Sequence, residues 1–190
     1  MHGMSTGRRL QDPKGGSFWF DAGAVCLDFA HTGGEGDYAI FESLHAPSDF
    51  TTWLAELGVV VDALSDADLV AAKTLRQAIW EVAHAQADGV ALPAEAVAII
   101  NAAAIEPPLV PQLGTGWAPP VTASQVRSAL ARELIELLSG PLATRFRECA
   151  SDNCPLVFVD ASRPGTRRWC SMERCGNRSK LRAHRARHAP

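Results

Sequence analysis

Four of the five cysteines lie within residues 149–175, as two pairs in which four residues separate the thiols. The pairs are Cys149 with Cys154 and Cys170 with Cys175. Two short cysteine loops joined by a hairpin-length spacer are typical of a structural zinc site, because each loop can wrap two thiolates round one side of a tetrahedral ion. The spacing predicts one structural Zn²⁺ per chain, with cysteines free of metal, redox cysteines or an iron–sulfur centre as alternatives.

The redox environment bears on whether these thiols bind metal or form disulfides. The first ten residues contain two arginines but no apolar run behind them, which does not fit a signal peptide. No stretch approaches the roughly 18 to 20 apolar residues of a membrane span. We therefore expect a cytoplasmic protein with no membrane partner, in which thiols stay reduced. An apolar share of 47% with 21% charged residues also allows an ordinary globular core.

The first part of the chain, residues 1–143, has mainly helical patterns. Helices are predicted over 47–58, with Ser48 as its cap, and over 93–104 and 123–139. A longer helix begins at a capping box formed by Ser65 and Asp68 and ends at Gly89. Residues 16–34 mix aromatic and β-branched residues between glycines and predict one or two strands, while the proline-rich stretch after 105 predicts a loop. The expected class is α+β, with a mostly helical first domain.

Residues 144–190 have the local order of a small zinc module. Short strands are predicted at 146–149, 156–159 and 168–170, with a turn at 163–165. The glycine after Cys175 permits a tight turn, and Asn177 can cap a helix running to about residue 188. Knuckle, hairpin, knuckle and helix is the order of a treble-clef or ribbon-like module. About 45 residues bury little surface alone, so we expect the metal to supply much of the stability.

Charge divides the chain at the same place. Residues 141–190 carry a balance of +7, whereas residues 1–140 carry −10, which suggests two modules with different partners. Cations of the second module can neutralise phosphates, and a basic helix can enter a DNA groove. We therefore predict DNA as the partner, with RNA, a protein partner or the chain's own acidic domain as alternatives. The candidate contacts are Arg163, Arg167, Arg168, Arg174, Asn177, Arg178, Lys180, Arg182, Arg185 and Arg187.

Several single residues have a structural and a functional interpretation. His184 and His188 have helical spacing suited to a metal, but four thiolates already complete a site, so surface or phosphate contacts are preferred. Trp169 can stack on a base or pack against the zinc core. Asn177 and Arg178 can contact a nucleic acid or brace the second knuckle. Cys26 fits a buried apolar position. The remaining group is a candidate effector pocket, for which a structural cluster at a strand end is the preferred interpretation: Asp28, His31 and Thr32.

The C-terminal stretch resembles the CGNR-type zinc finger, named after the tetrapeptide found here at Cys175–Arg178. The likeness extends to the four cysteines, the strand Val157–Asp160, the Ser162-Arg163 turn, the run Arg168–Met172 and the basic helix. In that family the finger follows an alpha-beta domain of stress-induced bacterial transcription regulators. Residues 26–32, 49–54, 75–76 and 100–101 are similar to segments of that domain, with His31 in place of the family's usual asparagine. The resemblance implies a zinc-containing, DNA-binding transcription regulator whose first domain senses a small effector.

An enzyme is the competing class. Catalytic zinc keeps an open coordination position and about three protein ligands, whereas four cysteines close the shell. The sequence has no phosphate-binding loop, nucleophile elbow or dinucleotide fingerprint. We therefore expect no catalytic residues.

Overall fold

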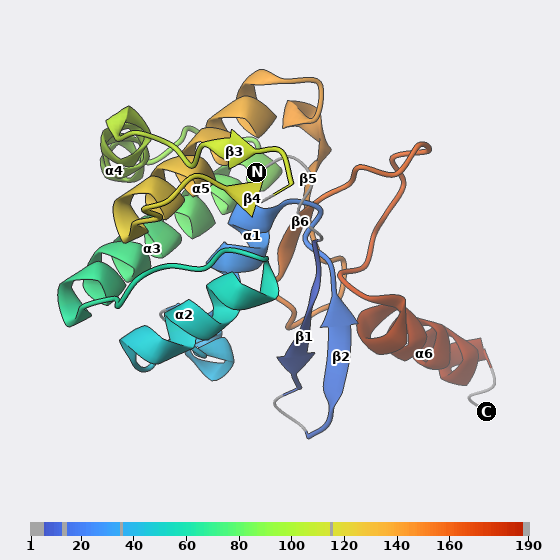
Figure 1. Ribbon diagram of the computed structural model, residues 1–190. Coiled ribbons are helices and arrows are strands. Elements are labelled where there is room, and N and C mark those ends of the chain that lie inside the picture. Colours follow the sequence, from blue (N-terminus) through green and yellow to red (C-terminus); the bar gives the residue numbers. More distant parts are fainter. Residues whose placement is uncertain (1–5, 13–14, 35, 115, 188–190) are drawn as a thin grey trace.

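The computed structural model describes residues 6–12, 15–34, 36–114 and 116–187. They form a mostly helical α+β fold with short strands, as the sequence predicts, and the strands pair as three separate antiparallel hairpins (Figure 1). The hairpins are β1 (Arg8–Gln11) with β2 (Ser17–Phe20), β3 (Pro111–Gln112) with β4 (Gly116–Trp117), and β5 (Phe146–Glu148) with β6 (Val157–Val159). The α-helices are α1 (Val25–Ala30), α2 (Pro47–Glu56), α3 (Asp66–Asp88), α4 (Ala94–Ile105), α5 (Ala123–Ser139) and α6 (Asn177–Arg187).

Helices α3, α4 and α5 pack on one another and form the largest part of the first domain. The predicted capping box opens α3, because the Ser65 Oγ accepts from the backbone N–H of Asp68 at 3.2 Å and the Asp68 carboxylate accepts from Ser65 N. Gly89, with φ +67, ends the helix. The periodic apolar positions of α3 and α5 face the core, namely Leu69, Ala72, Leu75, Ile79, Val82, Val126, Leu130 and Leu134.

Among the described residues no helix is both long and apolar enough to cross a membrane.

The expectation of strands over residues 16–34 is only half right. Residues 17–20 form β2, but its partner β1 lies upstream, and Val25–Ala30 form the short helix α1. All six residues of α1 are buried, and the helix packs against α3 and α5. The Glu133 carboxylate of α5 accepts from Cys26 N at 2.6 Å and satisfies one of the helix's first N–H groups. An apolar run buried on every side has no period from which helix and strand can be distinguished.

Helix α2 begins one residue earlier than its predicted cap. Pro47 is its first residue, Ser48 already lies inside it, and Ala46 is the N-cap. The Asp49 carboxylate accepts from Ala46 N at 2.8 Å and supplies the missing cap. Proline suits the first helical position because its absent N–H would have no partner there.

The hairpin β5–β6 belongs to the same continuous core as the helices. Val157, Phe158 and Val159 are all buried, and the hairpin packs against α3. Val159 N donates to the Ala22 carbonyl at 2.9 Å, which ties β6 to the segment before α1. Gly23 permits this approach, since it has φ +82 and an added Cβ would lie 2.5 Å from the Val159 carbonyl oxygen. The C-terminal module is therefore anchored to the first domain rather than hinged from it.

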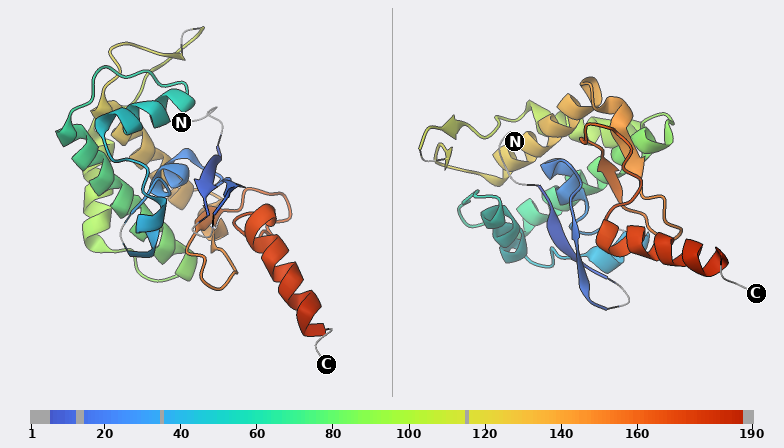
Figure 2. Two further views of the ribbon diagram at one scale, coloured as in Figure 1. Left: turned by 90° about the horizontal axis from the view of Figure 1, so that it is seen from below. Right: turned by 90° about the vertical axis from the view of Figure 1, so that its right-hand side faces the viewer.

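The second cysteine loop differs from its predicted structure. Residues 168–170 form no strand and contribute one ladder-like bond, from Ala150 N to the Arg168 carbonyl at 2.8 Å. A π-helical turn, η3 (Met172–Gly176), then runs directly into α6. Helix α6 packs mainly on η3 and projects away from the body of the molecule, as all three views show (Figures 1 and 2).

Candidate metal centre and basic helix

The four predicted cysteines converge on one point. Cys149 and Cys154 flank the turn that joins β5 to β6, while Cys170 and Cys175 lie before and within η3. Their sulfur atoms all lie within 4.8 Å of one another, with 3.6 Å between Cys154 and Cys170 and 3.5 Å between Cys170 and Cys175. A tetrahedral ion with Zn–S bonds of about 2.3 Å needs sulfur separations of about 3.8 Å. The cluster therefore has the size and ligand number of a closed Cys₄ zinc site.

The mutual electrostatics of these four thiols favour a bound cation. Hydrogen bonds within the cluster, that with Cys149 first, hold the pKa of Cys175 well below its ordinary value and raise that of Cys170 well above it. Four thiolates cannot ionise together at this separation, because like charges in a buried site disfavour one another. A divalent ion removes this conflict and lets all four remain deprotonated.

The Cys-Gly-Asn-Arg tetrapeptide has a local structural task in the second loop. Arg178 donates from Nη2 to the Cys175 sulfur at 3.0 Å. Gly176 is buried, and an added Cβ would lie 2.7 Å from the Met172 side chain and 3.4 Å from the Trp169 ring. Asn177 has helical angles, φ −67 and ψ −38, and its amide donates to the Glu173 carbonyl at 3.4 Å. Close packing explains the glycine, and Asn177 continues a helix that it was expected to cap.

Arg174 links the metal cluster to the first hairpin. Its Nε donates to the Asp12 carboxylate at 2.6 Å, and its Nη1 lies 3.5 Å from the Cys154 sulfur. The guanidinium also lies 4.6 Å from the Phe18 ring centroid. Arg174 is 9% exposed, so its charge faces the protein interior.

Arg167 also has partners inside the module. Its Nε donates to the Trp169 carbonyl at 3.1 Å and its Nη2 donates to the Cys170 carbonyl. The guanidinium lies 4.0 Å above the Phe158 ring, and Asp160 accepts from the Arg167 backbone N–H at 2.8 Å. Arg167 therefore holds the loop that leads into Cys170.

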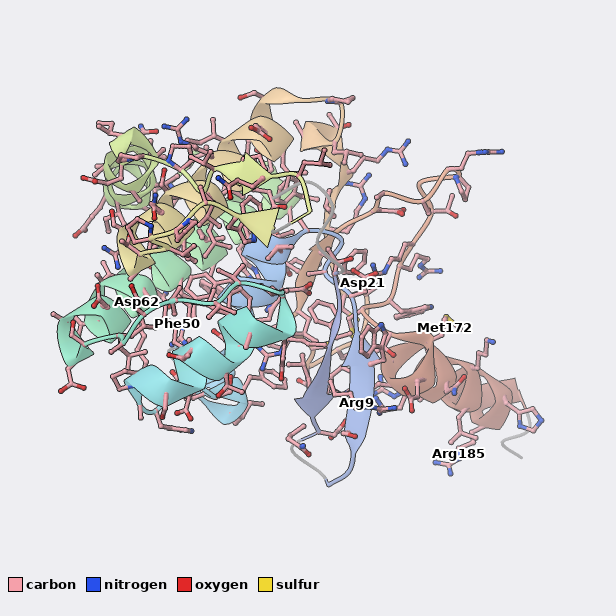
Figure 3. The ribbon with its side chains drawn as sticks, in the orientation of Figure 1. Arg9, Asp21, Phe50, Asp62, Met172 and Arg185 are labelled. Atoms are coloured by element: carbon pink, nitrogen blue, oxygen red, sulfur yellow. The ribbon has the colours of Figure 1, made fainter. Side chains whose placement is uncertain are left out.

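The remaining predicted contacts are exposed cations of the 161–168 loop and of α6. Arg163 lies at the tip of the 161–168 loop and Arg168 beside Trp169. Arg182 makes an exposed ion pair with Asp152 at 2.8 Å, which is easily exchanged for a phosphate. Arg185 extends from α6 into solvent (Figure 3). Together with Lys180 they form the cationic surface, defined as Arg163, Arg168, Lys180, Arg182 and Arg185.

The three residues of the candidate effector pocket are buried and engaged. Asp28 accepts from Gly7 N at 2.6 Å and Ala22 N at 3.1 Å, while the Thr32 hydroxyl donates to the Phe29 carbonyl. The His31 Nε2 lies 2.7 Å from the Val157 carbonyl oxygen of β6. Burial raises the pKa of Asp28 to about 7 and lowers that of His31 to about 3. These residues join the first domain to its hairpin and to the zinc module.

The other candidate residues of the sequence differ in how far they are buried. Cys26 is fully buried in α1, and burial raises the pKa of its thiol. Trp169 is half-buried and packs against the core. His184 is exposed on α6, whereas His188 and the Arg187 side chain lie outside the described residues.

Sequence reasoning missed the contributions of the first hairpin. Asp12 pairs with Arg174, Phe18 packs under the same guanidinium, and Trp19 points outward with 49% of its surface exposed. The alternation in Ser17–Phe20 already places Trp19 on the face opposite Phe18 and Phe20. That pattern identifies an outward aromatic residue, but nothing local indicates that it lies beside the cysteines.

Comparison with known families agrees with this division of the chain. The family model ABATE, whose description is "Putative stress-induced transcription regulator", matches residues 23–141. The model of the CGNR zinc finger matches residues 145–188, which include all four clustered cysteines. No curated protein matches the chain.

The first match covers more than half of the chain, and the second gives the cluster its metal, one structural Zn²⁺. The buried residues of α1, α3 and α5 lie within the first match, and the projecting helix α6 lies within the second. The chain thus belongs to the ABATE family of transcription regulators and carries a C-terminal CGNR zinc finger.

Proposed function

We propose that this regulator binds duplex DNA through α6 and the cationic surface beside it. The observation that carries the proposal is the basic helix itself, which projects from the body and is rooted at its first turn in the cysteine cluster (Figures 1 and 2). Asn177–Arg187 contains five cations and no acidic residue. The closely spaced cations of this short helix can neutralise several successive phosphates.

The dimensions and the charge distribution support the same partner. Eleven residues make a helix about 16 Å long, and a major groove about 12 Å wide admits an α-helix. The first 140 residues carry a net charge of −10 and are repelled by DNA. Residues 141–190, with a net charge of +7, therefore face the DNA as the protein approaches. The cytoplasm, where thiols stay reduced, suits a site made of four cysteines.

Binding across a salt series tests the proposal. With about five phosphate contacts, log K should fall with a slope of about −4 to −5 against log salt, and Lys180→Ala or Arg185→Ala should each reduce the slope by about 1. Arg132→Ala, on α5, is the matched control and should leave binding unchanged. Absence of duplex binding at low salt favours a protein-interaction module, and tighter binding of matched RNA favours an RNA-binding factor.

We infer that the first domain senses a small effector through a cavity between α3 and α4. The cavity has a volume of about 580 Å³, and its lining includes Glu42, Lys73, Arg76 and Glu95. Arg76 pairs with Glu42 through two hydrogen bonds of 2.9 and 2.6 Å. Mixed charges around a space of this size favour a small ligand with both an acidic and a basic group.

A short route leads from this cavity to the zinc module. Arg76 donates to the Thr32 hydroxyl at 3.3 Å, and the neighbouring His31 contacts the β6 carbonyl of Val157. A panel of free amino acids tests the inference by thermal shift, with Lys73→Ala as the variant. A member of the panel that raises the melting temperature should also change DNA affinity, because coupling between sites is reciprocal. If no member does either, the effector part fails while DNA binding stands.

A further inference from the structure

A groove lies where the first hairpin meets the second cysteine loop. Its volume is about 700 Å³, and residues from both modules line it. Strand β2 supplies one wall, and the segment around η3 supplies the other. The side chains that matter here are Trp19, Asp21, Arg168, Trp169, Met172 and Glu173.

Trp19 lines this groove and is held in place. Its neighbours Phe18 and Phe20 are buried, whereas Trp19 is 49% exposed. A Cβ added to Gly7 would lie 2.5 Å from the Trp19 Cζ2, so the Gly7 backbone covers part of the ring. The Trp19 backbone N–H donates to the Glu173 carboxylate at 3.3 Å, which fixes the strand against η3. The result is a large aromatic platform at a defined position beside the finger.

The opposite wall has complementary chemistry. Met172 is 51% exposed, and its side chain rests against Gly176. A Cβ added at Gly176 would lie 2.7 Å from the Met172 side chain and displace it. The Arg168 guanidinium lies 5.2 Å from the Trp169 ring centroid. Aromatic rings, a polarizable thioether and a stacked guanidinium are the groups on which nucleic-acid bases stack. Figure 3 shows Met172 near the start of α6, and Asp21 at the end of β2 nearest the module.

The charges favour a base over an apolar peptide. Arg163 and Arg168 are exposed in the loop that supplies part of the lining, and the basic helix α6 begins four residues after the lining residue Glu173, so cations near the groove are available to phosphates. Within the lining, Asp21 and Glu173 are carboxylates that can accept hydrogen bonds from an exocyclic amino group. Cytosine, adenine and guanine offer such a group, whereas thymine does not.

We propose that this groove binds one unpaired, amino-bearing base of DNA, so that the protein prefers duplexes containing such a base. The proposal rests on the DNA-binding function proposed above and assigns a second contact to it. The helix and the cationic surface hold the phosphates, and Trp19 stacks on the displaced base.

The experiment compares three labelled DNAs with identical flanks: a perfect duplex, one with a single unpaired cytosine, and one with a single unpaired thymine. The parent should bind the cytosine-bulged duplex about tenfold more tightly than the perfect one, the effect of one base–aromatic stack. The thymine bulge should fall between them. Trp19→Ala should abolish these differences and keep both the affinity for perfect duplex and its salt slope. Leu113→Ala, at an exposed hairpin tip, is the control that should change nothing.

Two further variants keep the test independent of folding. Trp19→Phe retains an aromatic face and should keep part of the preference, and Met172→Ala should weaken it from the other wall. Zinc content and circular dichroism show whether each variant is folded. Equal affinity of the parent for all three DNAs overturns the groove proposal and leaves the DNA-binding function intact. No binding to any of them overturns the function, and the groove proposal with it.

Discussion

The Nη2 of Arg178 lies 3.0 Å from the sulfur of Cys175, so the last residue of the Cys-Gly-Asn-Arg tetrapeptide braces the first. One turn of helix separates the two residues, and the contact aligns the start of α6 with the cluster. A Cys₄ site with Zn²⁺ carries a charge of about −2, which a nearby guanidinium compensates. Arg174, 3.5 Å from the Cys154 sulfur, adds a second cation on the same cluster.

Arg178→Ala should lower zinc affinity by about tenfold or more, because removal of a hydrogen bond to a metal ligand commonly costs 10- to 100-fold. Competition with a chromogenic chelator measures the change. Arg185→Ala, in the same helix but exposed, should keep the parent's zinc affinity and lose DNA affinity instead. Equal zinc affinity in the parent and Arg178→Ala would show that the contact does not support the metal.

Features governed by neighbours in sequence could be predicted. The two cysteine pairs, the Ser65–Asp68 capping box and the periodic faces of α3 and α5 depend on residues within a few turns of one another. Their physical causes are local: a loop wraps an ion, a hydroxyl caps an N–H, and every third or fourth residue faces inward.

Features that depend on tertiary packing could not be predicted. Helix α1 is a buried run in which the N–H of Cys26 donates to Glu133, a residue more than 100 positions away. Arg174 looked like one more surface cation, but Asp12 and Phe18 from the distant hairpin enclose it. The docking of β6 on Ala22 was likewise invisible in a sequence that suggested a separate module.

Metal removal should loosen the second cysteine loop and α6 while leaving helices α3, α4 and α5 folded. Strands β5 and β6 are fixed by α3 and by Ala22, whereas η3 and α6 depend mainly on the cluster and on Arg174. Hydrogen exchange after chelation should rise over residues 166–187 and stay low over α3 and α5. Metal analysis should give one zinc per chain, with Cys175→Ser reducing it and Cys26→Ser preserving it. Uniform loss of protection across the whole chain would contradict this division.

Replacement of Gly23 by alanine should cost more stability than replacement of Gly89. Both glycines have positive φ, +82 and +67, so both substitutions carry about 1 kcal/mol or more of backbone strain. Only at Gly23 would the new Cβ also meet a neighbour, the Val159 carbonyl at 2.5 Å, whereas Gly89 faces open space. Chemical denaturation should show an excess of about 1–3 kcal/mol for Gly23→Ala. Equal losses would mean that β6 does not press on this segment.

Asp28, within α1, and His31, the C-terminal cap of this helix, are both buried. The two groups should have opposite effects on stability as pH changes. His31 has a pKa of about 3 in the folded protein because burial disfavours its charge, and about 6.5 when unfolded. The unfolded chain therefore binds the extra proton, and stability falls as pH decreases from about 6.5 toward 3. Asp28, with a pKa raised by burial to about 7, stabilises the fold below about pH 4, and that contribution is lost as pH rises through 7. The two slopes nearly cancel between about pH 4 and 6.5.

His31→Asn should expose the slope that His31 contributes. Asparagine takes up no proton, so whatever the constant cost of losing the contact with Val157, the stability of the variant relative to the parent should rise as pH falls from 6.5 to 5. The gain should approach about 1.4 kcal/mol per pH unit. Urea denaturation of both proteins at each pH, with saturating zinc, measures it, because Asp28 and the metal site then cancel in the difference. Parallel stability curves would mean that His31 takes up its proton in the folded state as readily as in the unfolded chain.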